Sequence, residues 1–318
     1  MTMPNTIFIT ALVCTFFSLS AYSASKYTGP IIDVHVHAYK DGSPLFGLEH
    51  PPTLRGKTYR AAKNAVHLKQ EVLKRFHKYN IVKAVVTAGE LWLEDAPTTI
   101  LVANATKPPS ILKKQHELGY LDVIAELAPF YEGKRLDHPS IERYFKLAEE
   151  LGVPIGVHIF PGGPNFGLHY LPEMLGSMRA YNASPGQIEN LLVKYPKLKL
   201  YIMHGGWPFI EDLKSLLYMH PNVYVDIAVV NWILPEKEVI NYILSLTDSG
   251  FGDRILYGSD QMVWPDIIDD AIATINDCEA LTLKQKADIF YNNAAKFLGL
   301  TDKQMSQHRT KKIRVKVP

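Results

Sequence analysis

Three side chains that can bind metal ions or move protons alternate along a short apolar run near the start of the chain. The run "IIDVHVHAY" covers residues 31–39 and contains Asp33, His35 and His37. Side chains at positions i and i+2 lie on the same face of a β-strand, so we expect the two imidazoles to point to the same side. Two imidazoles on one face are suited to bind a divalent cation. We expect Asp33, on the same face and lower in the strand, to orient a histidine ring.

Other polar residues stand where further apolar runs end. Glu126 occurs in "VIAELAP", His158 in "VPIGVHIF", His204 in "LYIMHGGWP" and Asp260 in "ILYGSDQMVWP". Strand alternation predicts that His204 continues the row of Leu200 and Ile202. By the same alternation, Asp260 continues the row of Leu256 and Gly258. Both rows are expected to point into the barrel and to end in a polar side chain.

Imidazoles and carboxylates that converge in a buried place are costly unless a partner satisfies them. A lone histidine at a strand end is usually an ordinary hydrogen-bonded residue, but four of them together with an aspartate favour a metal site. The donor types suit one divalent cation, zinc first, with manganese, iron or nickel also compatible. Glu126 is expected to be a metal ligand, a general base or a structural acceptor.

The elements that would position these residues follow a regular pattern. Amphipathic segments with three- and four-residue apolar spacing lie between β-branched runs, as in residues 65–80, 139–152, 208–221 and 234–246. This alternation predicts an α/β fold, a (β/α)8 TIM barrel in a single domain. A doubly wound open sheet is the alternative, but no glycine-rich phosphate turn follows the first run. The β-branched runs cover residues 30–36, 81–87, 99–103, 121–127, 153–159, 198–203, 223–227 and 255–257.

Two long connections, residues 39–65 and 160–183, follow the first and fifth predicted strands. Both fall at the carboxyl ends of strands, the face where barrel enzymes keep their active sites. Arg55 and Arg179 lie in these connections and are candidates for holding a substrate carboxylate. His169 and Trp207 are candidates for other substrate contacts.

Composition and the chain ends limit the possible partners and compartments. The chain has 318 residues and a formal charge of +2, which argues against nucleic acid as a partner. Residues 1–23 resemble a signal peptide, although no Lys or Arg precedes Lys26. We therefore expect an exported protein, periplasmic or secreted, without a membrane anchor after cleavage. The barrel is expected to span residues 24–300, followed by a basic tail at 301–318. The sequence leaves a homo-oligomer open.

Together, "DVHVH", the histidine of the fifth strand, "HGGWP", "YGSDQMVWP" and the closing "IFYNNAAKFLGL" resemble the amidohydrolase superfamily. They are most similar to its amidohydrolase-related branch, which includes the aminocarboxymuconate semialdehyde decarboxylase-like enzymes. The resemblance covers about residues 30–300. It implies that His35, His37, His158 and Asp260 bind a catalytic metal and that His204 polarises the substrate or moves protons. The fourth strand does not end in a lysine, so a carboxylated-lysine bridge is not available and a single metal is expected.

Three functions remain open at this point. The first is metal-dependent hydrolysis of an ester, lactone or amide in a small organic substrate, with Asp260 as the proton acceptor. The second is non-oxidative decarboxylation of an unsaturated or aromatic acid at the same residues. The third is an exported binding protein without catalysis. The fold alone does not choose among them.

Overall fold

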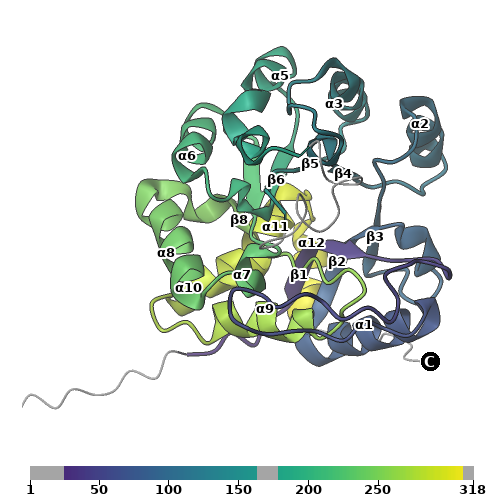
Figure 1. Ribbon diagram of the computed structural model, residues 1–318, viewed down its shortest axis with the longest axis vertical. Coiled ribbons are helices and arrows are strands. Elements are labelled where there is room, and N and C mark those ends of the chain that lie inside the picture. The colour runs from purple at the N-terminus through teal and green to yellow at the C-terminus, as the bar shows by residue number, and fades with distance from the viewer. Residues whose placement is uncertain (1–24, 163–177, 311–318) are drawn as a thin grey trace, which may run out of the picture.

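The computed structural model describes residues 25–162 and 178–310. Within these ranges the chain forms parallel strands at the centre and helices around them (Figure 1). Each strand lies within two or three residues of the run that predicted it. The strands are β1 (Ile31–His37), β2 (Ile81–Thr87), β3 (Ile100–Ala103), β4 (Ile124–Leu127), β5 (Ile155–His158), β6 (Leu200–Met203), β7 (Val223–Asp226) and β8 (Ile255–Leu256).

The strands follow one another in chain order. Parallel pairing joins β1-β2-β3 and, separately, β4-β5-β6-β7-β8. A bridge between Ala103 and Val123 connects β3 to the start of β4. Between β8 and β1, the Val34 amide donates to the Tyr257 carbonyl at 3.0 Å. The predicted (β/α)8 barrel is therefore the fold of this chain.

Helices cover the outside of the ring, and the sequence explains where they begin and end. In α1, the side chain of Asn64 caps the first turn by accepting from the His67 amide at 2.8 Å. Asn80 ends the same helix in the left-handed conformation. In α3, the side chain of His138 accepts from the Ser140 amide at 3.2 Å, and Gly152 ends the helix in the left-handed conformation. The helices are α1 (Ala65–Tyr79), α2 (Pro109–Glu117), α3 (Pro139–Leu151), α5 (Glu189–Lys194), α6 (Ile210–Met219), α7 (Val230–Ile233), α8 (Glu236–Leu246), α9 (Ile267–Asn276), α10 (Leu283–Ala287), α11 (Asn293–Phe297) and α12 (Asp302–Thr310).

The inside of the barrel holds a separate apolar cluster. The Tyr201 hydroxyl donates to the Val34 carbonyl at 3.4 Å, and this contact must cross the interior because β6 and β1 are not neighbours. Tyr201 and Met203 therefore point inward, whereas Leu200 and Ile202 pack in the outer layer with the helices. The inward row predicted for β6 was wrong by one residue. At the lower end, the ring of Phe297 in α11 packs against Tyr201 at 5.6 Å between ring centroids.

The described structure extends past the expected barrel boundary at residue 300. Helix α12 joins the domain through a hydrogen bond of 3.0 Å between the Tyr291 hydroxyl and His308. The segments 1–24 and 311–318 lie outside the described residues, and with them the expected signal peptide and the end of the basic tail. In the part of the chain that the structure describes, no helix has the length and apolar character needed to cross a membrane.

Candidate active site

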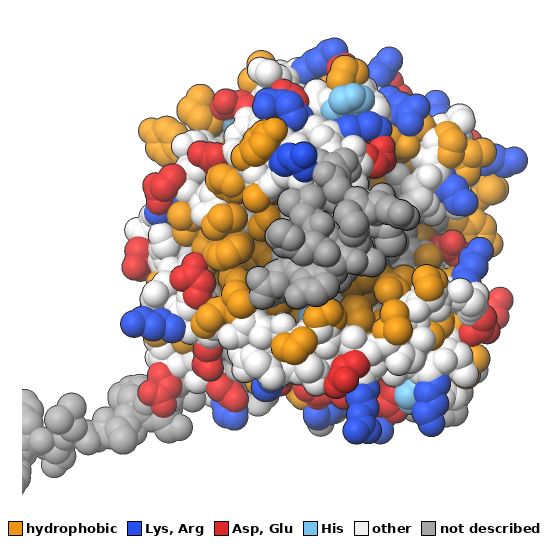
Figure 2. All heavy atoms as spheres, in the orientation of Figure 1, with side chains coloured by type: hydrophobic (Ala, Val, Ile, Leu, Met, Phe, Trp, Pro, Cys, Tyr) orange, Lys and Arg blue, Asp and Glu red, His pale blue; other side chains and the backbone are white. Residues whose placement is uncertain are grey.

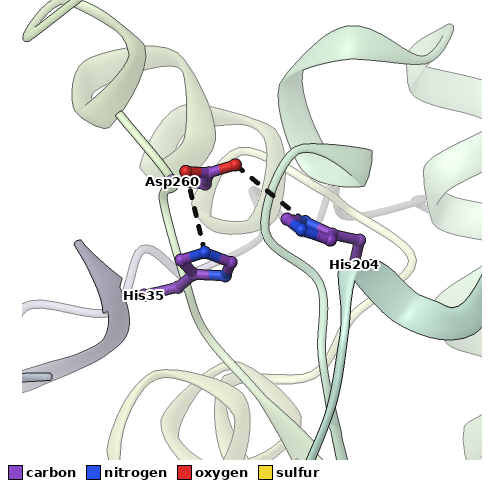
Figure 3. Close-up of side chains that lie close together, drawn as sticks. All are labelled: His35, His204 and Asp260. Atoms are coloured by element: carbon purple, nitrogen blue, oxygen red, sulfur yellow. Dashed lines mark ion pairs between the residues drawn. The ribbon is translucent and has the colours of Figure 1, made fainter. Parts of the chain in front are cut away.

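The carboxyl ends of five strands bring the expected residues together. His35 and His37 end β1, Glu126 is in β4, His158 ends β5, and His204 directly follows β6. Asp260 lies four residues beyond β8, and its carboxylate points between the imidazoles of His35 and His204 (Figure 3). His35, His158, His204 and Asp260 are buried, while His37 and Glu126 are partly exposed. Residues up to 225 positions apart in the sequence thus converge on one place.

Two of these residues reach the site by a turn of the backbone, not by strand alternation. His204 has a φ of +62° and Asp260 has a φ of +49°, the left-handed region that non-glycine residues seldom adopt. Met203 occupies the inward position of β6, and the turn at the next residue then redirects His204 into the same space. Strand alternation thus predicted that His204 would reach the site, but the residue gets there through this turn of the backbone.

Each buried imidazole is anchored through one ring nitrogen, which leaves the other directed into the site. His35 Nδ1 donates to Asp226 Oδ2 at 3.1 Å. His158 Nε2 donates to the Phe160 carbonyl at 3.2 Å, and His204 Nδ1 donates to the Ala228 carbonyl at 3.4 Å. Since these acceptors fix the proton on the outer nitrogen, the inner nitrogens present lone pairs. This is the arrangement that metal-binding histidines adopt.

Glu126 lies between two pairs of histidines. Its Oε2 is 3.6 Å from His35 Nε2 and 3.7 Å from His37 Nε2. Its Oε1 is 2.5 Å from His158 Nδ1 and 3.1 Å from His204 Nε2. The atoms form three groups of possible ligands, and the expected set is divided: His158 groups with Glu126 and His204, not with His37.

The fit of a cation can be tested on the groups that lack a partner. His35 Nε2 and Asp260 Oδ1 are buried and have no hydrogen bond within the described residues. Asp260 Oδ1 lies 3.6 Å from His35 Nε2 and 2.9 Å from His37 Nε2, so three groups of the ligand type face one another. Ligand atoms about 2.0–2.2 Å from a tetrahedral cation are themselves about 3.4 Å apart. In addition, the inner nitrogens of His158 and His204 are 2.9 Å apart, which brings two lone pairs together. A divalent cation would satisfy the buried atoms that lack a hydrogen bond and would separate the two facing lone pairs. The residues therefore fit a metal.

Charge stabilises the ionised form of both carboxylates. Burial favours a higher pKa for Glu126, but the imidazole of His158 outweighs it and holds the pKa well below the ordinary value. Burial opposes ionisation of Asp260 as well, and the charge of His35 keeps its pKa below the usual range. For His35, burial favours a lower pKa, yet Asp260 and Asp226 raise it well above normal, so without a cation the inner nitrogen holds a proton that metal binding would displace. The site therefore carries negative charge that attracts a cation.

Asp33 acts on the backbone and does not contact a histidine ring. Its Oδ1 accepts from the amides of His35 at 3.1 Å and Ser259 at 3.0 Å, which ties β1 to the segment after β8. Burial raises the pKa of Asp33 to about 7. The ring-orienting role expected of Asp33 falls to Asp226 for His35. The register shift in β1 between Asp33 and Val36 explains why the predicted common face is not kept.

The expected substrate-binding residues are not gathered at the metal ligands. Arg55 is partly buried and donates to the carbonyls of Leu234 and Asn231 and to the Thr274 hydroxyl, so its guanidinium ties loops together. Arg179 is exposed and donates to the Met178 carbonyl at 2.7 Å. Trp207 donates to Glu238 at 3.1 Å on α8, and its ring meets Phe160. His169 lies outside the described residues.

Sequence reasoning missed three residues at the site. Asp226 ends β7, the same kind of strand-end position that identified its neighbours, so the signal was present. Gln261 follows Asp260, and its buried amide holds both backbone groups of His37, at 3.1 Å and 2.6 Å. His50 packs edge-on against Trp264 and Trp232, with centroids 4.7 and 5.2 Å away. No local pattern predicts that cluster, because its rings come from distant segments.

Comparison with known proteins agrees with this geometry. The family model described as amidohydrolase matches residues 32–300. No curated protein matches the chain. Solved structures that share the fold include a probable 2-pyrone-4,6-dicarboxylic acid hydrolase from Acinetobacter baumannii with citric acid bound. It has 14% identity, covers 85% of this chain and 99% of its own, and gives a TM-score of 0.58.

Two decarboxylases have a similar fold. The 2,6-dihydroxybenzoate decarboxylase from Rhizobium shows 14% identity, coverage of 86% and 99%, and a TM-score of 0.54. The 5-carboxyvanillate decarboxylase from Novosphingobium aromaticivorans, complexed with manganese, shows 16% identity, coverage of 72% and 80%, and a TM-score of 0.51. At such identities the structures establish the fold alone. Since the family model spans most of the barrel and its ligand residues, the chain belongs to the amidohydrolase family of metal-dependent enzymes.

Proposed function

We propose that this enzyme is a metal-dependent hydrolase that cleaves an ester, lactone or amide bond in a small organic substrate. The observation that carries the proposal is the convergence of inward-facing imidazole nitrogens on the two carboxylates of Glu126 and Asp260. One cation would be held by His35 and His37 with Asp260 and Glu126. Zinc suits these donors best, and manganese, iron and nickel remain compatible.

The protein residues take the following parts in the reaction. When bound, the cation supplies Lewis acidity that lowers the pKa of a water and polarises a carbonyl group. Asp260 Oδ1, which lies 2.9 Å from His37 Nε2 and faces the site, accepts a proton and returns it to the leaving group. His204 presents Nε2 as a proton acceptor, because its Nδ1 donates to Ala228. Asp226 keeps His35 in the required orientation.

Replacing Asp260 by Asn tests the central role. We expect Asp260→Asn to lower kcat by about 10²–10⁴-fold, since the variant loses the proton acceptor. The measurement is a panel of esters, lactones and amides with the zinc-loaded protein, together with its melting temperature. Asp277→Asn is the control, because Asp277 pairs with Lys26 at the surface. An Asp260→Asn variant that keeps most of its kcat would refute the assigned role.

Non-oxidative decarboxylation is the second candidate, and one cavity favours it. A cavity of about 420 Å³ is lined by Glu126 together with Lys134 and Arg143. Lys134 pairs with Glu132, whereas Arg143 has no ion-pair partner within the described residues. Its guanidinium lies over the ring of Tyr144, 5.2 Å from the centroid, and its charge suits a carboxylic acid. Release of carbon dioxide from unsaturated and aromatic acids, lowered by Arg143→Gln, would favour this function over hydrolysis.

Export to the periplasm or secretion is also proposed, on the sequence of residues 1–23. The partner is a small-molecule substrate, and a homo-oligomer is compatible with the sequence.

A barrel that only binds ligands is the least favoured reading, because the set of metal-type side chains is complete. Ligand binding that needs no metal and leads to no turnover would support it.

A further inference from the structure

Two tyrosines stand beside the metal-type residues without belonging to them. Tyr39 lies two residues after β1, and Tyr131 lies in the short 3₁₀ helix Pro129–Glu132 that follows β4. The ring of Tyr39 is 6.1 Å from that of His37, and the ring of Tyr131 is 4.7 Å from that of His158. Each tyrosine therefore lies beside one of the two histidine pairs that surround Glu126.

Neither hydroxyl group has a hydrogen bond within the described residues. In contrast, most partly or fully buried tyrosines of this chain use their hydroxyls. Tyr242 donates to the Gly205 carbonyl, Tyr201 to the Val34 carbonyl and Tyr59 to Asp270. Tyr131 remains 43% exposed, so a ligand can reach it. An accessible phenol without a partner next to catalytic groups is available for substrate.

Both phenols are protonated at neutral pH, because a tyrosine hydroxyl has an ordinary pKa of about 10. Burial raises the pKa of Tyr39, and the negative charges of Asp260 and Glu126 raise it further. Burial and the same two carboxylates raise the pKa of Tyr131 well above its ordinary value, with a contribution from Tyr39. Both hydroxyls are therefore hydrogen-bond donors at neutral pH and do not act as bases. On the face of the molecule shown in Figure 2, apolar side chains gather around the centre.

We infer that the hydroxyl groups of Tyr39 and Tyr131 bind a second oxygen function of the substrate, next to the group held by the cation. The inference rests on the proposed metal site and adds the class of substrate. That class is a small organic molecule with two oxygen-bearing groups close together, such as a carboxylate beside the scissile carbonyl. The two tyrosine hydroxyls would favour such a substrate over one with a single polar group, because each can donate a hydrogen bond to the second oxygen function.

The test uses matched acids as probes of the cobalt-loaded protein. Malonate, succinate and glutarate are compared with propionate, butyrate and pentanoate, in which a methyl group replaces the second carboxylate. The visible absorption of Co²⁺ reports binding without any need for turnover. We expect one diacid to bind the wild type about tenfold or more tighter than its monoacid, because hydrogen bonds to a charged group are strong. Tyr39→Phe and Tyr131→Phe should each remove most of that gain.

Tyr218→Phe is the matched control, since Tyr218 is 80% exposed and lies on the outer helix α6. It should keep the full gain, and all three variants should keep the wild-type cobalt content and melting temperature. The inference is overturned if no diacid binds tighter than its monoacid, or if the gain survives in either Tyr39→Phe or Tyr131→Phe. A wild-type protein that binds no cobalt overturns the proposed function as well, which separates the two failures.

Discussion

At the scale of single residues, the site depends on side chains that do not contact substrate. Asp226 is fully buried, and its carboxylate accepts three hydrogen bonds from the described residues. Its Oδ2 accepts from His35 Nδ1, while its Oδ1 accepts from the amides of His204 at 2.8 Å and Ala228 at 3.0 Å. One carboxylate thus fixes the tautomer of one imidazole and the backbone turn that positions another.

Replacing Asp226 by Asn should weaken metal binding by about 10–100-fold, the usual cost of losing such an outer partner. Asn has one oxygen, so its NH₂ group must face a donor at one of the three contacts. Competition with a chromophoric chelator measures the zinc affinity. Asp122→Asn is the control, because Asp122 also accepts a backbone amide, that of Val102, but away from the site. Equal zinc affinity in the Asp226→Asn and wild-type proteins would contradict the argument.

At the scale of elements, the helices that follow the first and the last strand, α1 and α9, are joined by ion pairs. Asp269 in α9 accepts from Lys78 at 2.7 Å, Tyr79 at 2.5 Å and Arg75 at 2.6 Å, all in α1. Burial favours a higher pKa for Asp269, but these hydrogen bonds outweigh it and lower the pKa. Because α1 follows β1 and α9 follows β8, the contact closes the ring on its outside.

A lowered pKa makes this contact sensitive to acid. Its stabilisation is present above the unfolded-state pKa of about 4 and is lost as the pH falls through the lower folded-state pKa. We expect Asp269→Asn to lose on the order of 1 kcal/mol of unfolding free energy at pH 7. It should show a shallower loss of stability than the wild type between pH 4 and 2. Urea unfolding at several pH values measures this, with the exposed Asp253→Asn as control. Parallel pH profiles for the wild-type and Asp269→Asn proteins would exclude the assigned role.

The sequence predicted the elements better than the geometry between them. Strand positions followed from β-branched runs, and the strand-end residues His35, His158 and Asp260 followed from the end of each run. The left-handed turns at His204 and Asp260 were not predictable, since neither residue type signals such a φ. Strand alternation therefore failed for β6, and the division of the histidines around Glu126 was out of reach. Asp226 could have been found by the rule already applied to its neighbours.

At the scale of the whole molecule, one end of the barrel carries a cluster of ionisable side chains whose negative charge a cation would balance. Four carboxylates, those of Asp33, Glu126, Asp226 and Asp260, lie at one end of the ring with four imidazoles. The backbone also crosses the closing seam there, where the Asp260 amide donates to the His35 carbonyl at 2.8 Å. The ligands are therefore attached to the joint between the first and last strands, so metal binding and barrel stability are coupled.

Removing the metal should lower both turnover and stability. We expect dialysis against a chelator to abolish hydrolysis and to lower the melting temperature, and added Zn²⁺ or Mn²⁺ to restore both. A cation at 100 times its Kd stabilises the folded state by about 2.7 kcal/mol. Calorimetry measures the shift in melting temperature, and elemental analysis of the reloaded protein measures the number of bound cations, for which we expect one. Magnesium, which prefers oxygen donors, is the control ion and should restore little. A chelator-treated protein with undiminished turnover and an unchanged melting temperature would show that these histidines serve the fold alone.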